Sequence, residues 1–175
     1  MPPFLSTKRK SPPLHKAVQE HVLSLLPLNE AILEYPFPGH FADVAWPKMG
    51  IVFEIQCSPI SLKEVKKRIE DYANLGYQVI WILHQKTFNK RLLSRSEMYL
   101  RTHAVTFFTN ITAGGKGNIY DQKEILKGMI RTDRSPPFQV NVRGPFFLDP
   151  PKKRTLNILS LYDQLLFKLV RALNG

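Results

Sequence analysis

The sequence predicts an α/β domain with a mixed central β-sheet that is flanked by helices. Three observations indicate this class: two short apolar runs joined by the turn residues 47–50, an amphipathic helical pattern after them, and a nearly all-apolar run at residues 78–83. A strand that is apolar throughout is typical of a parallel sheet covered on both faces, and it is reached through a helical crossover. A hairpin followed by such a crossover gives a sheet with both strand directions.

The two runs around the turn are predicted to pair as a hairpin. If the turn is centred between Lys48 and Met49, Asp43 lies directly opposite Glu54. Because side chains alternate across a strand, one face of this hairpin is wholly apolar and is expected to face the core: Ala42, Val44, Trp46, Ile51, Phe53, Ile55 and Cys57. The other face carries Asp43, Glu54 and Gln56. Two facing carboxylates repel each other, and a divalent metal ion would offset that repulsion.

Patterns before the hairpin predict one helix and one strand. An apolar stripe at helical spacing runs from residue 14 to residue 25, with prolines at its start and Pro27 after its end. Residues 31–37 predict a first strand. Residues 1–12 are rich in proline, serine and basic side chains, and we expect them to form a flexible basic arm.

Patterns after the hairpin predict alternating helices and strands. Ser61 and Glu64 have the spacing of a capping box, and Gly76 ends the helix that they begin. A helix carrying many basic residues is expected beyond His84, and residues 104–109 predict another strand.

We expect a core at residues 13–110 and a C-terminal extension at residues 111–175. The extension contains a glycine-rich loop at residues 112–118 and strand-like pieces that the pattern does not place. It ends in a predicted long amphipathic helix with this apolar stripe: Leu159, Tyr162, Leu166, Leu169 and Leu173. That helix would pack on the core or on a second copy of the chain, which makes a homodimer possible.

The charge of the chain predicts an anionic partner. Its formal charge is +11, from 25 lysines and arginines against 14 acidic residues, which makes nucleic acid the first candidate. Ribosomal-type binding, an anionic membrane surface and simple solubility remain alternatives. The single cysteine, Cys57, excludes an internal disulfide and a cysteine-rich zinc site, so a reducing cytoplasm fits best. We expect no signal peptide and no membrane-spanning segment.

The carboxylates Asp43 and Glu54 are the candidate metal ligands and catalytic residues. Mg²⁺ prefers carboxylate oxygens, keeps several waters and takes further ligands from phosphate. Such an ion activates a bound water and neutralises the charge that develops on a phosphate during displacement. Gln56 lies two residues beyond Glu54, so its side chain could orient the water or contact the phosphate. The residues thus predict a metal-dependent phosphodiesterase site.

These residues resemble a known nuclease motif. Asp43 followed by Glu54-Ile55-Gln56 is similar to the PD-(D/E)XK motif. The longer stretches at residues 41–44, 54–58 and 81–83, with Arg68 and Tyr72 between them, resemble the nuclease-like domain of CoiA-type competence proteins. The resemblance covers roughly residues 15–83. It implies a restriction-endonuclease-like fold, a DNA substrate and Mg²⁺ or Mn²⁺ as the cofactor.

The resemblance also bears on individual residues. Gln56 stands where PD-(D/E)XK nucleases usually have a lysine, a departure that the CoiA-like branch shares, and a glutamine brings no positive charge and cannot act as a general base. Arg68 and Tyr72 are one helical turn apart and share a face. Because a Gln-x-x-x-Tyr pair lies near the active site of RecB-like nucleases, Arg68 is expected to contact a phosphate.

Further residues are candidates for supporting or nucleic-acid-binding roles. His15 matches a histidine of the family pattern, Glu20 lies on the same predicted helix, and Glu34 lies on the first strand. Each of these three could equally be a solvent-facing residue. The candidate nucleic-acid contacts are Arg68, Tyr72, Lys86, Lys90, Arg91 and Arg95, for which a solvated helix face is the alternative.

The sequence therefore supports one leading function and two alternatives. The leading prediction is a Mg²⁺- or Mn²⁺-dependent nuclease that hydrolyses DNA phosphodiester bonds. The first alternative is a catalytically silent nucleic-acid-binding module, because the usual lysine is missing. The second is an assembly protein that acts through its C-terminal helix.

Overall fold

A seven-stranded β-sheet forms the centre of the computed structural model, which describes residues 12–143. The strand order is β1-β2-β3-β4-β5-β6-β9. Strands β3, β4 and β5 run parallel to one another, and the other neighbouring pairs are antiparallel, so the predicted mixed sheet is confirmed. The strands are β1 (Ile32–Phe37), β2 (His40–Trp46), β3 (Ile51–Gln56), β4 (Gln78–His84), β5 (Val105–Thr109), β6 (Ile119–Asp121) and β9 (Phe138–Gln139).

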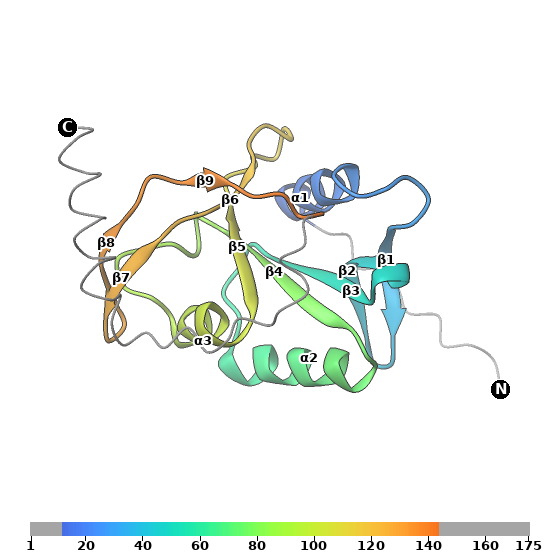
Figure 1. Cartoon of the computed structure of the whole chain (residues 1–175), viewed down its shortest axis with the longest axis horizontal. Coiled ribbons are helices and arrows are strands. Elements are labelled where there is room, and N and C mark those ends of the chain that lie inside the picture. Colours follow the sequence, from blue (N-terminus) through green and yellow to red (C-terminus); the bar gives the residue numbers. More distant parts are fainter. Residues whose placement is uncertain (1–11, 144–175) are drawn as a thin grey trace.

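Three helices cover the two faces of this sheet within the described range. Figure 1 shows α1 (Pro13–Ser24) on one side and both α2 (Leu62–Asn74) and α3 (Arg95–His103) on the other. The crossover from β3 to β4 runs through α2, and the crossover from β4 to β5 runs through α3. Buried side chains form one hydrophobic cluster on each face, so the core is divided by the sheet.

The helix boundaries follow local chemistry. Pro13 occupies the first turn of α1, where its missing N–H costs no hydrogen bond. The Ser61 hydroxyl accepts a hydrogen bond from the backbone N–H of Glu64 at 3.1 Å, which confirms the predicted cap of α2. Ser94 caps α3 in the same way through the N–H of Glu97.

The predicted register of the central hairpin is confirmed. Val44 pairs with Phe53 and Trp46 pairs with Ile51, and Asp43 and Glu54 lie just beyond the last of these pairs. A short 3₁₀ turn, η1 (Pro47–Met49), joins the strands. Gly50 follows it with a φ of 64°, a left-handed conformation that suits glycine.

The predicted apolar face of the hairpin is wrong at Ala42. Val44 packs in the cluster on the α1 side, whereas Ala42 and Ala45 both pack in the cluster on the α2 side. Strict alternation would put Ala42 and Ala45 on opposite faces, so the alternation breaks between them. The break lies where Glu34 of β1, with a φ of 49°, interrupts the β1–β2 ladder beside Asp43.

The helix expected after His84 is shorter than predicted. Residues 85–94 form a loop, and α3 begins only at Arg95. The side chains of Phe88 and Leu93 anchor this loop in the protein interior. Because Ser94 caps the helix, the basic residues before it lie on the loop.

The chain beyond β5 adds strands at the far end of the sheet. The glycine-rich loop predicted at residues 112–118 lies between β5 and β6, and β6 itself was not predicted. At Gly117 a Cβ atom would lie 2.7 Å from the Cα of Ile111, so only glycine fits this close approach. Strands β7 (Glu124–Lys127) and β8 (Ile130–Arg134) form a separate two-stranded sheet. The predicted basic arm, except Pro12, and the predicted C-terminal helix lie outside the described residues.

A buried ion network fastens this two-stranded sheet to α3. Arg131 pairs with Glu97 at 2.8 Å and with Glu124 at 2.6 Å. Arg101 pairs with Glu124 and with Asp121, each at 2.8 Å. Arg101 is thus a buried structural residue.

Among residues 12–143, no helix has the length and apolarity that crossing a membrane requires.

Candidate active site

The carboxylates of Asp43 and Glu54 are held by helices on opposite faces of the sheet. Asp43 of β2 contacts α1, whereas Glu54 of β3 contacts α2. This differs from the prediction that both side chains share one face of the hairpin. The break in alternation between Ala42 and Ala45 lies at Asp43 and accounts for the difference.

Asp43 accepts hydrogen bonds on both carboxylate oxygens. Its Oδ1 accepts from His15 Nε2 at 2.9 Å and from Gln19 Nε2 at 3.2 Å. Its Oδ2 accepts from the backbone N–H of Ile55 at 2.7 Å, which ties Asp43 to the neighbouring strand. Three donors therefore fix the orientation of a carboxylate that is partly exposed to solvent.

His15 is the cationic partner of Asp43. Burial of the imidazole opposes its charge, but hydrogen bonds to Asp43 and to the Cys57 side chain outweigh burial and raise the pKa of His15 to about 10. His15 therefore carries a positive charge at neutral pH and stabilises the Asp43 carboxylate. The structure thus brings together Asp43 and one of the predicted supporting residues.

Glu54 is almost fully buried, with 1% of its side chain exposed. Its Oε1 accepts a hydrogen bond from the Tyr72 hydroxyl, and its Oε2 accepts one from Arg68 Nη1. Arg68 also donates from Nη2 to Oε1 of Glu64 at 2.9 Å. The predicted pairing of Arg68 and Tyr72 on one face of α2 therefore places both donors on a single carboxylate.

The position of Glu54 makes its ionisation costly. Burial, followed by the nearby charge of Asp43, raises the pKa of Glu54 to about 7, although Arg68 and Tyr72 oppose the shift. Burial, followed by the charge of Glu54, also raises the pKa of Tyr72, so its hydroxyl stays protonated and donates. Asp43 and Glu54 thus interact electrostatically although they contact different helices.

The remaining predicted residues near the carboxylates lie apart from them. The Gln56 amide donates to the carbonyl oxygen of Ser58 at 2.6 Å and to its hydroxyl at 3.3 Å. Glu20 has 58% of its side chain exposed and pairs with Lys16 at 3.6 Å on the outer face of α1. Glu34 lies between the ladder pairs on either side of Asp43, at the interruption described above.

The predicted nucleic-acid contacts fall into two groups. The exposed residues Lys86, Lys90 and Arg91 lie on the loop after β4, and the exposed Arg95 opens α3. Tyr72 is fully buried, which is incompatible with a surface contact to nucleic acid. Its hydroxyl donates a hydrogen bond to Glu54 instead. Arg68 is partly exposed and lies between the interior and the surface.

Two residues that the sequence interpretation missed complete the site. Gln19 was not among the predicted site residues, but it is buried and donates to Asp43. Glu64 was seen only as a capping residue, but it holds Arg68. The available signal was spacing, because His15 with Gln19 and Glu64 with Arg68 are both separated by four residues on a helix.

The donor chemistry of the two carboxylates suits a divalent cation. A carboxylate has about four lone-pair sites, so Asp43 and Glu54 retain acceptor capacity beyond their present hydrogen bonds. The negative charge of Asp43 also raises the pKa of Glu54, which shows that the two carboxylates repel each other. A cation between them would reduce this repulsion. Mg²⁺ needs only one or two carboxylates, with water and phosphate as its other ligands. Within residues 12–143 there is no cluster of three or more histidine, cysteine or acidic side chains that could hold a metal.

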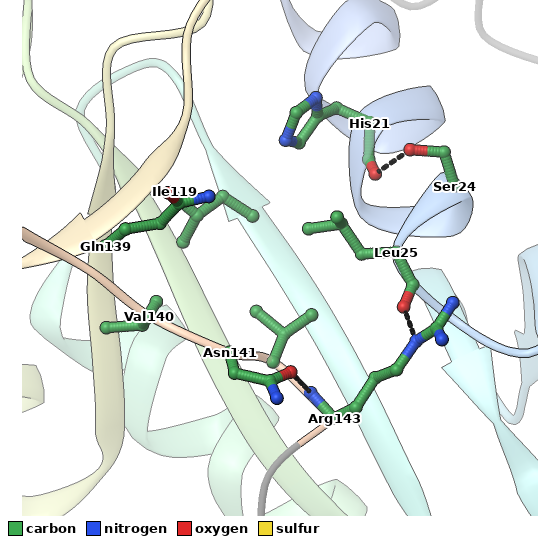
Figure 2. A pocket seen from close by; sticks show the side chains of 9 residues that line it. His21, Ser24, Leu25, Ile119, Gln139, Val140, Asn141 and Arg143 are labelled. Carbon is green, nitrogen blue, oxygen red and sulfur yellow. Dashed lines mark hydrogen bonds between the residues drawn. The ribbon is translucent and has the colours of Figure 1, made fainter.

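A cavity of about 600 Å³ lies at the other end of α1 (Figure 2). Figure 2 shows His21 and Leu25 of the α1 region facing Val140 and Asn141, which come from the last described residues. The cavity is lined by His21, Ser24, Leu25, Ile119, Gln139, Val140, Asn141, Val142 and Arg143. None of these is a carboxylate or a predicted site residue, so the cavity is distinct from the candidate active site.

A comparison with protein-family models matches most of the described chain. The model of the nuclease-like domain of the competence protein CoiA matches residues 33–140, which include β1 through β9 except the first residue of β1. Asp43, Glu54 and both residues of α2 that hold Glu54 lie within the matched range. Neither the curated proteins nor the solved structures include a match to this chain.

Proposed function

Because this chain belongs to the family of the CoiA nuclease-like domain, we propose that it is a Mg²⁺- or Mn²⁺-dependent nuclease that hydrolyses DNA phosphodiester bonds. The element order of one helix, three strands, a helix and a strand supports the finer interpretation as a restriction-endonuclease-like core. The observation that carries the proposal is that Asp43 of β2 and Glu54 of β3 lie just beyond the last paired positions of these two strands, close enough for the charge of Asp43 to raise the pKa of Glu54.

Asp43 and Glu54 would hold the metal ion between them. When bound, the ion would supply an activated water and would neutralise negative charge on the phosphate. The chain positions its own groups for this task before any substrate arrives. His15 and Gln19 fix the Asp43 carboxylate, and the Tyr72 hydroxyl fixes that of Glu54.

Other residues would act on the water and the DNA backbone. In this proposal the Gln56 amide leaves Ser58 and positions the water or the phosphate. Arg68 contacts the phosphate, and the exposed Lys86, Lys90 and Arg91 hold the backbone further away. Contacts of this kind are electrostatic and largely independent of sequence.

Replacement of either carboxylate tests the proposal directly. We expect Asp43→Asn and Glu54→Gln each to reduce Mn²⁺-dependent cleavage of DNA by at least about 100-fold, because each would remove a metal ligand. Cleavage is measured with purified full-length protein, and circular dichroism checks that each variant is folded.

The matched control is Glu20→Gln, which removes a carboxylate from the outer face of α1. We expect this variant to cleave at the rate of the unmodified chain. Undiminished cleavage by a folded Asp43→Asn or Glu54→Gln variant would remove that residue from the mechanism.

A catalytically silent nucleic-acid-binding module is the second candidate function. Two observations favour it: the Gln56 amide is bonded to Ser58, and both oxygens of Glu54 already accept hydrogen bonds. Calorimetric titration with Mn²⁺ separates the two functions. No binding at millimolar Mn²⁺, with or without DNA, would favour the silent module.

Substitution at Gln56 adds a second test of that choice. If the missing lysine limits turnover, Gln56→Lys should increase the cleavage rate at saturating Mn²⁺.

An assembly function, a homodimer through the predicted C-terminal helix and a cytoplasmic location stay predictions. Gel filtration with and without residues 159–175 would test the first two.

A further inference from the structure

The Glu54 carboxylate is covered on both oxygens by side chains of α2. Oε1 accepts from Tyr72 and Oε2 accepts from Arg68. Since only 1% of the Glu54 side chain is exposed, an ion has almost no access to it from solvent. Tyr72 is buried and neutral, whereas Arg68 is a cation with 27% of its side chain exposed. Oε2 keeps a free lone pair, but a metal ion that reaches it from solvent would have to move the partly exposed guanidinium of Arg68 aside.

Glu64 offers the displaced guanidinium a second partner. Its Oε1 lies 2.9 Å from Arg68 Nη2, and 50% of its side chain is exposed. Arg68 thus bridges an inner and an outer carboxylate with different nitrogens. When Nη1 leaves Glu54, the contact through Nη2 can persist without a change of helix position.

Charge balance favours this exchange. Without metal, the charge of Arg68 offsets that of Glu54. With a divalent cation on Glu54, the like charge of the guanidinium would be repelled, and Glu64 would then be its counter-ion. Asp43 needs no such exchange of a cation. Two of its three donors are neutral amides, and its side chain is partly exposed.

We propose that Arg68 is a displaceable counter-ion of Glu54 and that Glu64 is the positioning residue that receives Arg68 when a divalent metal ion binds. This inference rests on the proposed function, because it requires metal binding at Glu54. It adds to that function a role for Glu64 and a movement of the Arg68 guanidinium away from Glu54. The displaced Nη1 of Arg68 becomes available to the phosphate only after the metal is in place, which couples the two ligands.

Mn²⁺ affinity, measured by calorimetry on the full-length chain without DNA, tests the inference. Arg68→Met removes the competing cation, so we expect the Kd for Mn²⁺ to fall by about tenfold even as cleavage is lost. Glu64→Gln removes the outer partner and leaves Arg68 on Glu54, so we expect the Kd to rise by about two- to fivefold, as an exposed ion pair would give.

Two control variants on α2 separate the proposal from a general effect of charge. Lys67→Met removes one positive charge from the adjacent position, where Lys67 has 69% of its side chain exposed and pairs with Asp71 at 2.6 Å. Glu70→Gln removes one exposed negative charge two residues beyond Arg68. Both should leave the Kd for Mn²⁺ within about a factor of two of the original value.

The double variant Arg68→Met/Glu64→Gln gives the sharpest test. If Glu64 acts through Arg68, its replacement should have no further effect on Mn²⁺ affinity once Arg68 is absent. An equal effect of Glu64→Gln in both backgrounds would overturn the role of Glu64. Should Arg68→Met fail to fold, Arg68→Lys serves instead, since lysine keeps the charge but cannot bridge both carboxylates as a fork.

The outcomes distinguish this inference from the proposed function. If the original chain binds Mn²⁺ through Asp43 but Arg68→Met binds no more tightly, the counter-ion role is wrong and the metal site stands. If neither protein binds Mn²⁺, both proposals fail. Binding by Arg68→Met alone would show that Arg68 excludes the metal from the original chain, which would overturn both its displacement and the metal-dependent function.

Discussion

At the scale of single residues, Glu54 is a carboxylate whose position opposes its charge. It is buried, and the charge of Asp43 lies nearby, whereas Arg68 and Tyr72 compensate only in part. A group held in this way reduces the stability of the folded chain at neutral pH. Such a loss is typical of functional sites, where selection acts on chemistry and not on stability.

The pH dependence of stability should reveal this effect. The pKa of Glu54 is raised from 4.5 in the unfolded chain to about 7 in the folded one, so the folded state holds the proton more tightly. The favourable contribution is complete below pH 4.5 and is lost as the pH rises through about 7. We expect the free energy of unfolding to fall by on the order of 3 kcal/mol over this range relative to Glu54→Gln.

Urea denaturation at pH 5 and at pH 8, with a chelator present, measures this difference. Glu20→Gln controls for the loss of an exposed carboxylate and should show the pH dependence of the unmodified chain. A constant difference in unfolding free energy between the chain and its Glu54→Gln variant at both pH values would contradict the raised pKa.

At the scale of secondary-structure elements, the β7–β8 hairpin depends on buried charge. Arg131 of β8 pairs with Glu97 of α3 and with Glu124 of β7, and Arg101 of α3 also pairs with Glu124; all of these side chains are almost fully buried. We expect Arg131→Met to lower the free energy of unfolding by about 3 to 5 kcal/mol, because it leaves the buried Glu97 without its cation, whereas Glu124 keeps Arg101. Urea denaturation at neutral pH measures the loss.

Arg134→Met is the matched control, since Arg134 lies on the same hairpin but is exposed. We expect it to change the unfolding free energy by less than about 0.5 kcal/mol. Equal stabilities of the Arg131 and Arg134 variants would show that the buried network contributes little.

Elements with a strong local signal could be predicted from the sequence. The capping box at Ser61, the apolar run of β4 and the turn before Gly50 each depend on neighbouring residues, and each was found as predicted. The loop at residues 85–94 could not be separated from α3, because it is anchored by tertiary burial of Phe88 and not by a local pattern.

The same physical distinction applies to the candidate site. The position of Asp43 and Glu54 just beyond the paired residues of β2 and β3 follows from the turn and the register, so it could be predicted. Their separation between two helices could not, because it depends on the interruption at Glu34 and on packing of α1 and α2. The burial of Gln19 escaped prediction for this reason, since a glutamine beside charged residues has the pattern of a surface position.

At the scale of the whole molecule, the positive charge should dominate affinity for DNA. We expect Lys86→Gln/Lys90→Gln to weaken binding to all sequences about equally. The slope of log affinity against log salt should become shallower by about two, because each lost phosphate contact removes roughly one released counterion. Fluorescence anisotropy with duplexes of different sequence at several salt concentrations measures both effects.

Lys123→Gln/Lys127→Gln is the control for net charge, because these two exposed lysines lie near the β7–β8 hairpin and outside the predicted contacts. It should alter the salt slope less than the first pair does. Equal slopes for the two double variants would indicate that the loop after β4 makes no specific contribution to DNA binding.

The attachment of each carboxylate to a different layer has a consequence for partial unfolding. Helix α1 covers its face of the sheet at the N-terminal end of the described chain, whereas α2 lies within a crossover between two central strands. A terminal helix can detach as its own cooperative unit while the central strands stay protected from hydrogen exchange. Detachment of α1 would release Asp43 from His15 and Gln19 but would leave Glu54 held. Heating should therefore separate the two halves of the site before the sheet itself melts.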